Sequence, residues 1–233
     1  MSKQKKVVIL TGAGISAESG IKTFRDSDGL WENHDVHEVA SPFGWSRNPE
    51  LVLRFYNQRR MQLLEVEPNA GHRALVDLEK HFDTAIVTQN VDDLHERAGS
   101  QNILHLHGEL NKVRSVRNPE LIYDWAGKEV NLGDTAEDGG QLRPHIVWFG
   151  EDVPQMEKAA LISSMADVLL IIGTSMVVYP ANTLVHYAPE HAEIYYIDPQ
   201  PFNYSTDQKV IQVQEPATVG VPQVVQDLIE RYA

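Results

Sequence analysis

The chain has 233 residues, of which 42% are hydrophobic, and a formal net charge of −13. This composition is typical of a soluble globular protein, and the acidic balance argues against nucleic acid as a main partner, because phosphate contacts need a basic surface. The absence of cysteine excludes disulfides, thiolate nucleophiles and cysteine-ligated zinc.

Short apolar runs alternate with segments of helical period. We expect strands at residues 6–11, 84–88, 103–106, 145–149, 168–173, 193–197 and 210–213. We expect helices at residues 92–98, 155–165, 181–187 and 222–232. This alternation favours an α/β doubly wound, Rossmann-like fold with a parallel sheet covered on both faces.

Two segments interrupt the alternation and predict a smaller second lobe. Residues 27–68 contain a long helical stretch, and residues 111–143 are polar and rich in turn-forming residues. We expect a single domain over 1–233, with a core of about 1–32, 69–110 and 144–233 and a small lobe of about 33–68 and 111–143. No apolar run is long enough to span a bilayer, and the start lacks the features of a signal peptide. We therefore expect a cytoplasmic protein without a membrane partner, and a monomer.

The stretch GAGISAESG follows the first expected strand. Gly12, Gly14 and Ala17 match G-x-G-x-x-A, in which glycines allow a tight turn and close approach of a pyrophosphate. An ordinary strand-to-helix turn explains the same letters. Asp35 is near the place where a dehydrogenase would hold a ribose, but it lies at no obvious strand end.

Polar side chains also follow three later strands. Gln89, Asn90 and Asp92 follow residues 84–88, where they would line a ligand crevice or simply cap a helix. The strand 168–173 ends in GTS, which suits phosphate or ribose contacts but also fits an ordinary turn. His105 and His107 share one face of a strand, so they could ligate a metal, whereas a single histidine of ordinary pKa suits general-base work.

Taken in order, the motifs GAGIS with TFR, TQNVD, HLHGEL, RPHIVWFGE and GTS with VYPA resemble the sirtuins, the NAD-dependent protein deacylases. The resemblance covers about residues 7–225. It implies a doubly wound NAD domain and a small lobe made by two insertions. It also implies release of nicotinamide, free lysine and O-acyl-ADP-ribose, with His107 as the general base on a ribose hydroxyl and Asn90 as its catalytic neighbour.

The resemblance further implies where NAD binds. Phe24 and Arg25 would belong to a mobile loop over the nicotinamide ribose, in which Lys22 replaces the usual proline. Tyr196 replaces the asparagine that often precedes the adenosine contact. The implied cofactor residues are Gly12, Ala13, Gly14, Ile15, Ser16, Phe24, Arg25, Gln89, Asn90, Asp92, His107, Gly173, Thr174, Ser175, Asp198 and Ala217.

Two features concern the substrate. Val147, Trp148, Phe149, Gly150 and Val178 resemble the strands between which an acyl-lysine peptide binds. Tyr56 and Arg59 would share a helix face and suit a carboxylate, although an amphipathic helix with Tyr56 in the core and Arg59 in solvent fits that spacing as well. Tyr-x-x-Arg and the small Ala40 resemble the class III sirtuins that remove succinyl, malonyl or glutaryl groups. We therefore expect desuccinylase, demalonylase and also deacetylase activity.

One departure from the family concerns metal. Most sirtuins hold a structural zinc in the small lobe with four cysteines, whereas this chain has Ser115 where the first would stand. We expect no zinc, and a lobe packed around Leu121, Ile122, Tyr123 and Trp125. Three rival functions stay open: an oxidoreductase using the Gly-rich turn, a sirtuin-like mono-ADP-ribosyltransferase, and a non-catalytic NAD sensor.

Overall fold

A six-stranded parallel sheet forms the centre of the protein. The computed structural model describes residues 4–22, 30–31 and 34–233, and the sheet order is β11–β10–β9–β1–β4–β5. These strands are β1 (Lys6–Thr11), β4 (Asp83–Thr88), β5 (Ile103–His105), β9 (Val168–Ile172), β10 (Glu193–Ile197) and β11 (Val210–Val213). Every pair is parallel, which confirms the predicted fold class, and each strand matches its predicted range to within one residue at either end.

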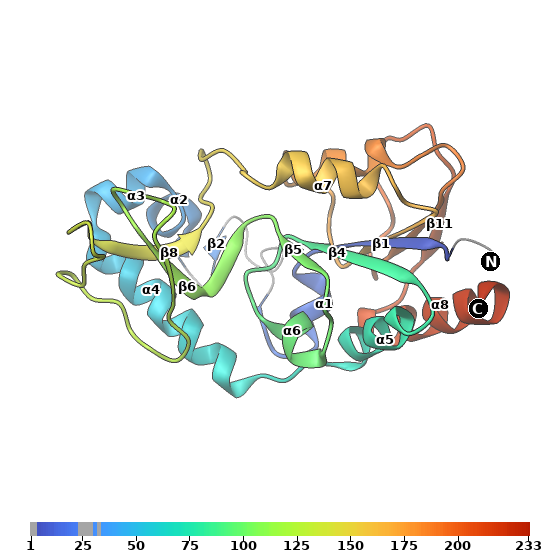
Figure 1. Cartoon of the computed structure of the whole chain (residues 1–233), viewed down its shortest axis with the longest axis horizontal. Helices are drawn as coiled ribbons and strands as arrows, with labels where there is room; N and C mark the ends of the chain where they lie inside the picture. The colour runs from blue at the N-terminus through green and yellow to red at the C-terminus, as the bar shows by residue number, and fades with distance from the viewer. Residues whose placement is uncertain (1–3, 23–29, 32–33) are drawn as a thin grey trace.

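Both faces of this sheet are covered (Figure 1). Helices α5 (Ala70–Glu79) and α8 (Ala217–Tyr232) lie on one side, and α7 (Met156–Ser163) and the 3₁₀ helix η3 (Ala181–Tyr187) on the other. Along β1, Val7 and Ile9 enter the first core, whereas Val8 and Leu10 enter the second. Successive strand residues point to opposite faces, so strands covered on both sides read as continuous apolar runs.

A second group of elements lies at one end of the molecule (Figure 1). It contains a three-stranded antiparallel sheet, ordered β7–β6–β8, beside helices α2, α3 and α4. Its elements are β2 (Leu30–Trp31), β3 (His34–Asp35), α2 (Val36–Val39), α3 (Pro42–Arg47), α4 (Pro49–Gln62), η2 (Leu63–Glu65), β6 (Gly108–Ser115), β7 (Ile122–Asp124) and β8 (Leu142–Ile146). We call this group the small lobe. We propose that it divides from the core near the predicted boundaries, with β2, β6 and β8 assigned entirely to the lobe.

Some predicted elements were wrong. The strand expected at 145–149 is β8, which ends at Ile146 and pairs antiparallel with β6 instead of joining the parallel sheet. Helix α8 begins at Ala217 and contains Pro222, which we had placed at its start. Strands β6 and β7 and helix α5 were not predicted. The remaining helices are α1 (Gly14–Ala17) and α6 (Leu94–Ala98), and α6 lies within its predicted range.

The small lobe is packed around an apolar cluster and one buried arginine. Leu53, Val113, Val130, Ala136 and Leu142 form the cluster, and Leu121, Tyr123 and Trp125 pack against it as predicted. The prediction for Ile122 was wrong, because 43% of that residue is exposed. Beside the cluster, the fully buried Arg60 donates to the Leu110 and Lys128 carbonyls and to Asn57.

Ser115 shows how the segment without cysteines is held. Its hydroxyl donates to the Asp138 carboxylate at 2.8 Å and accepts from the backbone N–H of Arg117 at 3.0 Å. The Asp138 carboxylate also accepts from the Gly140 N–H. One hydroxyl bonded to one carboxylate is a poor donor set for zinc, which prefers thiolate and imidazole. Across residues 4–22, 30–31 and 34–233 no group of three or more His, Asp or Glu side chains is arranged to hold a metal.

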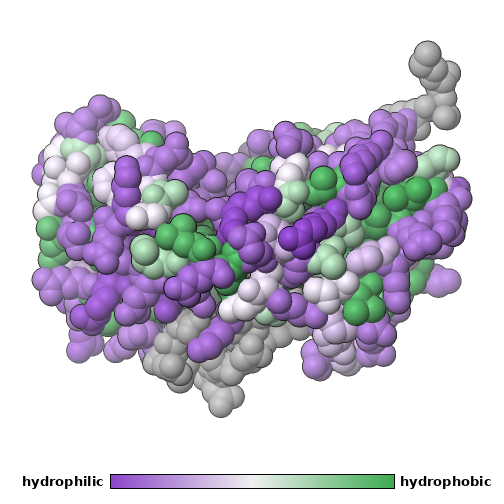
Figure 2. Space-filling model, turned by 90° about the horizontal axis from the view of Figure 1, so that it is seen from below, coloured by the Kyte–Doolittle hydropathy of each residue, from purple (hydrophilic) through white to green (hydrophobic). Residues whose placement is uncertain are grey.

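The surface in Figure 2 is mostly hydrophilic, with hydrophobic residues in small separate groups. In the described part of the chain, no helix is both long and apolar enough to cross a membrane.

Candidate active site

A cavity of about 710 Å³ opens at the carboxyl ends of the central strands. From β1 the chain builds the sheet outward in one direction through β4 and β5, and in the other through β9, β10 and β11. The point between β1 and β9 is therefore the topological switch point, where parallel sheets bind ligands. The cavity reaches from the tips of these strands to the small lobe.

Glycines allow close contact between the turns that follow β1 and β9. The Gly14 N–H donates to the Gly173 carbonyl at 2.8 Å. A Cβ on Gly14 would lie 2.6 Å from the Gly173 Cα, which is too close for any side chain. Gly173 has φ +61°, a conformation that glycine adopts without strain. The glycines predicted to approach a pyrophosphate are thus also required for the contact between the two strands.

Ser16 links two of the predicted site residues beneath the cavity. Its hydroxyl donates to the Asp92 carboxylate at 3.0 Å and accepts from the Asn90 side-chain amide at 3.2 Å. Asp92 also accepts from the Leu94 N–H, but the N-cap of α6 is Asp93, so the alternative of Asn90 or Asp92 as N-cap was wrong. Burial raises the pKa of Asp92 to about 6. This bonding holds the Asn90 and Asp92 side chains in place at the cavity wall.

His107 lines the cavity with one ring nitrogen already occupied. Its Nδ1 lies 3.1 Å from the Gln89 carbonyl oxygen. A carbonyl only accepts, so Nδ1 carries the hydrogen and Nε2 is left as the basic atom. Burial lowers the pKa of His107, which keeps the ring neutral. The geometry therefore suits a general base.

His105 holds the next carbonyl in the same way. Its Nδ1 lies 3.0 Å from the Asn90 carbonyl oxygen, and its Nε2 lies 2.7 Å from a Glu96 carboxylate oxygen. Burial would lower the pKa of His105, but the hydrogen bond and charge of Glu96 outweigh it, and the pKa is raised. His105 and His107 therefore serve separate carbonyls, and in the described residues they belong to no metal-binding group.

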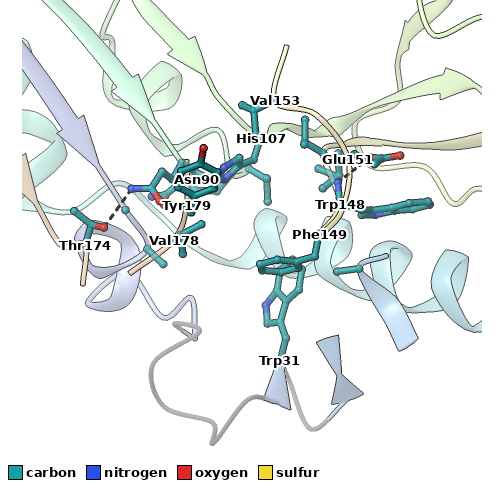
Figure 3. A pocket seen from close by; sticks show the side chains of 18 of the residues that line it. Trp31, Asn90, His107, Trp148, Phe149, Glu151, Val153, Thr174, Val178 and Tyr179 are labelled. Carbon is teal, nitrogen blue, oxygen red and sulfur yellow. Dashed lines mark hydrogen bonds between the residues drawn. The ribbon is translucent and has the colours of Figure 1, made fainter. Parts of the chain in front are cut away.

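The wall opposite His107 is aromatic (Figure 3). Trp31, Trp148, Phe149 and Glu151 gather there, whereas Asn90, His107, Thr174, Val178 and Tyr179 gather on the facing side. Tyr56 lines the cavity from α4, fully buried, and its oxygen accepts from the Trp148 indole N–H at 3.0 Å. The Phe149 N–H donates to the carbonyl of Ala40, another lining residue.

Most of the predicted residues come together at this cavity. Those that line it are Gly12, Ala13, Gly14, Ala40, Tyr56, Gln89, Asn90, Asp92, His107, Val147, Trp148, Phe149, Gly150, Gly173, Thr174, Ser175 and Val178. Phe24 and Arg25 lie outside the described residues.

Five predicted residues do not line the cavity. Ile15 lies in the core, and Ser16 is fully buried below the wall. Asp198 and Ala217 are buried at the end of β10 and the start of α8, where Asp198 accepts from the Gln200 N–H. Arg59 is half-buried, and its guanidinium lies 4.4 Å from the centre of the Phe55 ring.

Sequence reasoning missed an ion pair that supports the aromatic wall. Arg143 donates to Glu151 at 2.7 Å, and a Glu151 oxygen accepts from the Trp148 backbone N–H at 2.8 Å. Both charged residues lie in the motif RPHIVWFGE. Two opposite charges flanking a short apolar run were the available signal.

The chain is similar over nearly its whole length to proteins of one family. The model of the Sir2 family matches residues 12–180. A protein of Helicobacter pylori (strain ATCC 700392 / 26695) named "NAD-dependent protein deacylase" is 59% identical, covering 97% of this chain and 98% of its own. A Bacteroides thetaiotaomicron protein of the same name is 54% identical, covering 97% of this chain and 98% of its own.

Solved structures give the same result. A Sir2 homolog–NAD complex superimposes with a TM-score of 0.87 at 36% identity, covering 99% of this chain and 92% of its own. A complex described as Sir2–p53 peptide–NAD+ superimposes with a TM-score of 0.78 at 29% identity, covering 98% of this chain and 94% of its own.

Proposed function

This chain belongs to the Sir2 family, and we propose that it is an NAD-dependent protein deacylase that frees lysine side chains from acyl groups. The observation that carries this proposal is the state of His107. Its Nδ1 is hydrogen-bonded to the Gln89 carbonyl, and its Nε2 is left as the basic atom. His107 and Asn90 both line the cavity at the switch point of the sheet. An oxidoreductase site needs no such base beside the glycine tips.

The residues around the cavity fit NAD as the cosubstrate. The volume of about 710 Å³ exceeds what a peptide side chain alone needs, and polar groups of Asn90, Asp92, Thr174 and Ser175 converge on it. We infer that the backbone of Gly12–Ala13–Gly14 and the side chains of Thr174 and Ser175 hold the dinucleotide. When bound, NAD supplies a ribose carbon that takes the amide oxygen of the acyl-lysine as nicotinamide leaves.

The chain's own residues then have distinct tasks. His107 takes up a proton at Nε2. Asn90 and Asp92 orient the ligand, and the Ser16 hydroxyl fixes both of their side chains. Trp148 and Phe149 shield the reacting atoms from water and present the segment along which a peptide adds by main-chain hydrogen bonds.

Kinetics of His107→Ala test the proposal. With an acetyl-lysine peptide and NAD, we expect turnover to fall by about 100-fold or more, the usual contribution of a general base. The increase of melting temperature that NAD produces should persist, because the ring does not build the nucleotide-binding turn. His81→Ala, an exposed histidine beyond α5, is the matched control. Wild-type turnover in His107→Ala would contradict the role.

We further propose that the acyl group ends in a carboxylate, as in succinyl- or malonyl-lysine. Tyr56 lines the cavity, the small Ala40 leaves room beside it, and Arg59 lies one helical turn from Tyr56 on α4. A guanidinium and a phenol together suit a carboxylate.

The variant Arg59→Met tests this preference, with the exposed Arg54→Met on the same helix as its control. We expect the ratio of kcat/KM for succinyl over acetyl peptide to fall by about tenfold in Arg59→Met alone, since a hydrogen bond to a charged group contributes roughly 1.5–3 kcal/mol. Equal losses on both peptides would show that Arg59 is structural.

A further inference from the structure

Trp148 and Tyr56 form a buried hydrogen bond at the cavity wall. The Trp148 indole N–H donates to the Tyr56 oxygen at 3.0 Å, and both residues line the cavity. Trp148 is 2% exposed and Tyr56 is fully buried, so water does not compete for this bond. Trp148 lies just after β8 and Tyr56 lies in α4, so the two residues are far apart in the sequence.

The direction of this bond decides what Tyr56 can offer a ligand. An indole nitrogen only donates, so the Tyr56 oxygen must be the acceptor and its own proton must point elsewhere. Among the described residues, the Trp148 bond is the only hydrogen bond of the Tyr56 hydroxyl, and none of these residues accepts its proton. Burial raises the pKa of Tyr56 above its ordinary value, so the hydroxyl keeps that proton. A buried donor without an acceptor is costly, and a ligand oxygen would relieve that cost.

The indole itself is held firmly. The Arg143 guanidinium lies 3.3 Å from the centre of the Trp148 ring, and Trp45 packs against the ring with its centre 5.7 Å away. The Trp148 backbone N–H donates to Glu151, which is itself bonded to Arg143. The direction of the indole N–H is therefore set before a ligand binds, and the orientation of the Tyr56 hydroxyl is set with it.

We propose that Trp148 is a specificity-determining residue, which fixes the Tyr56 hydroxyl as a donor to the terminal carboxylate of the acyl chain. The inference rests on the proposed carboxylate-ended substrate and adds a residue that need not touch that carboxylate. Carboxylate oxygens accept such a proton, whereas the methyl end of an acetyl group cannot. Trp148 therefore favours carboxylate-ended acyl groups through Tyr56.

Two variants test the proposal by the ratio of kcat/KM for succinyl over acetyl peptide. Trp148→Phe keeps an aromatic ring between Arg143 and Trp45 but removes the N–H, and Tyr56→Phe removes the proton itself. We expect the ratio to fall about fivefold or more in each, the effect of losing about one hydrogen bond. The double variant should lose little more than Tyr56→Phe, because both changes remove the same contact. Trp125→Phe, which removes an indole N–H bonded to the Glu129 carbonyl away from the cavity, should keep the wild-type ratio.

Each other outcome has a separate meaning. If Tyr56→Phe lowers the ratio but a folded Trp148→Phe does not, the role of Trp148 is overturned and the carboxylate preference stands. If Trp148→Phe does not fold, a wild-type ratio in Tyr56→Phe still overturns the inference. If the wild-type enzyme removes acetyl but neither succinyl nor malonyl groups, the proposed acyl class is itself wrong and the inference falls with it.

Discussion

At the scale of single residues, two histidines hold two consecutive carbonyls beside the cavity. His107 bonds the Gln89 carbonyl, and His105 bonds the Asn90 carbonyl. Their protonation differs because only His105 has a carboxylate partner, Glu96. Burial alone lowers the pKa of His107. The pKa of His105 is therefore raised and that of His107 lowered, so His105 holds a proton more readily than its neighbour.

The lowered pKa of His107 predicts the pH dependence of activity. A base acts in its neutral form, and a lowered pKa means that this form persists to lower pH. The acid limb of kcat/KM should therefore lie below pH 6.5, the ordinary value for histidine. A profile from pH 5 to 8 on an acetyl peptide measures it. A limb above pH 6.5 would contradict the assignment, and Glu96→Gln would show whether His105 causes it.

Asp92 should lower the stability of the free protein near neutral pH. Its pKa is raised by burial from 3.8 to about 6, so the folded state holds its proton more tightly than the unfolded chain. The free energy of unfolding should fall as pH rises from about 4 to about 6 and stay low above it. Asp92→Asn should then be more stable than wild type at pH 7.5, by up to about 3 kcal/mol, and less active.

Denaturant titrations at pH 4 and pH 7.5 measure this difference. The two proteins should differ little at pH 4, because Asp92 is then protonated in the folded state and only about half ionised in the unfolded chain. A variant that is less stable than wild type at pH 7.5 would refute the argument.

At the scale of elements, α4 carries side chains with opposite tasks. Tyr56 faces the cavity, whereas the fully buried Arg60 faces the small lobe and bonds β6 and the 128–130 turn. Asn57 completes this link by exchanging two hydrogen bonds with the Val130 backbone. Helix α4 thus ties the lobe to the wall of the cavity.

Arg60→Ala should destabilise the protein by about 3 kcal/mol, because it leaves a cavity and removes the donor of the buried Leu110 carbonyl and of the Lys128 carbonyl. Denaturant unfolding measures this, with the exposed Arg54→Ala on the same helix as the control. A loss no greater than that of Arg54→Ala would mean that the lobe is held by apolar packing alone.

Removal of metal should leave the protein unchanged. Ser115 is bonded to Asp138 where the family's first cysteine is expected, and this donor set does not fit zinc. We expect no metal in elemental analysis and the same melting temperature with and without a chelator. Ser115→Ala should cost roughly 1 kcal/mol, since it removes the hydroxyl that links Asp138 to the Arg117 N–H. One zinc per chain would overturn this account of the lobe.

The elements differ in how well the sequence predicts them. Strands β1, β9 and β10 are buried on both faces, so their residues form apolar runs that periodicity detects. Strand β6 has several half-buried residues and the sequence GELNKVRS, in which polar residues dominate. Pro222 suggested a helix start because proline is common there, yet it lies in the second turn of α8.

At the scale of the whole molecule, the cavity joins the switch point of the sheet to the small lobe. Motifs placed Gln89, Asn90, His107 and Gly173 at strand ends, and the sheet brings those ends together. The bond between Trp148 and Tyr56 was not predictable, because it joins segments 92 residues apart across the lobe. Local sequence predicts what each strand end offers, and only packing decides which side chains meet.

The most direct test is mass spectrometry of the products that the wild-type protein forms from NAD and a peptide with one acyl-lysine. The account predicts one nicotinamide and one O-acyl-ADP-ribose for each lysine freed. ADP-ribose attached to the peptide would indicate a transferase. Free acyl acid without nicotinamide would indicate a simple hydrolase, and NAD binding without any product would indicate a sensor. Each of these three results would contradict the proposed deacylase.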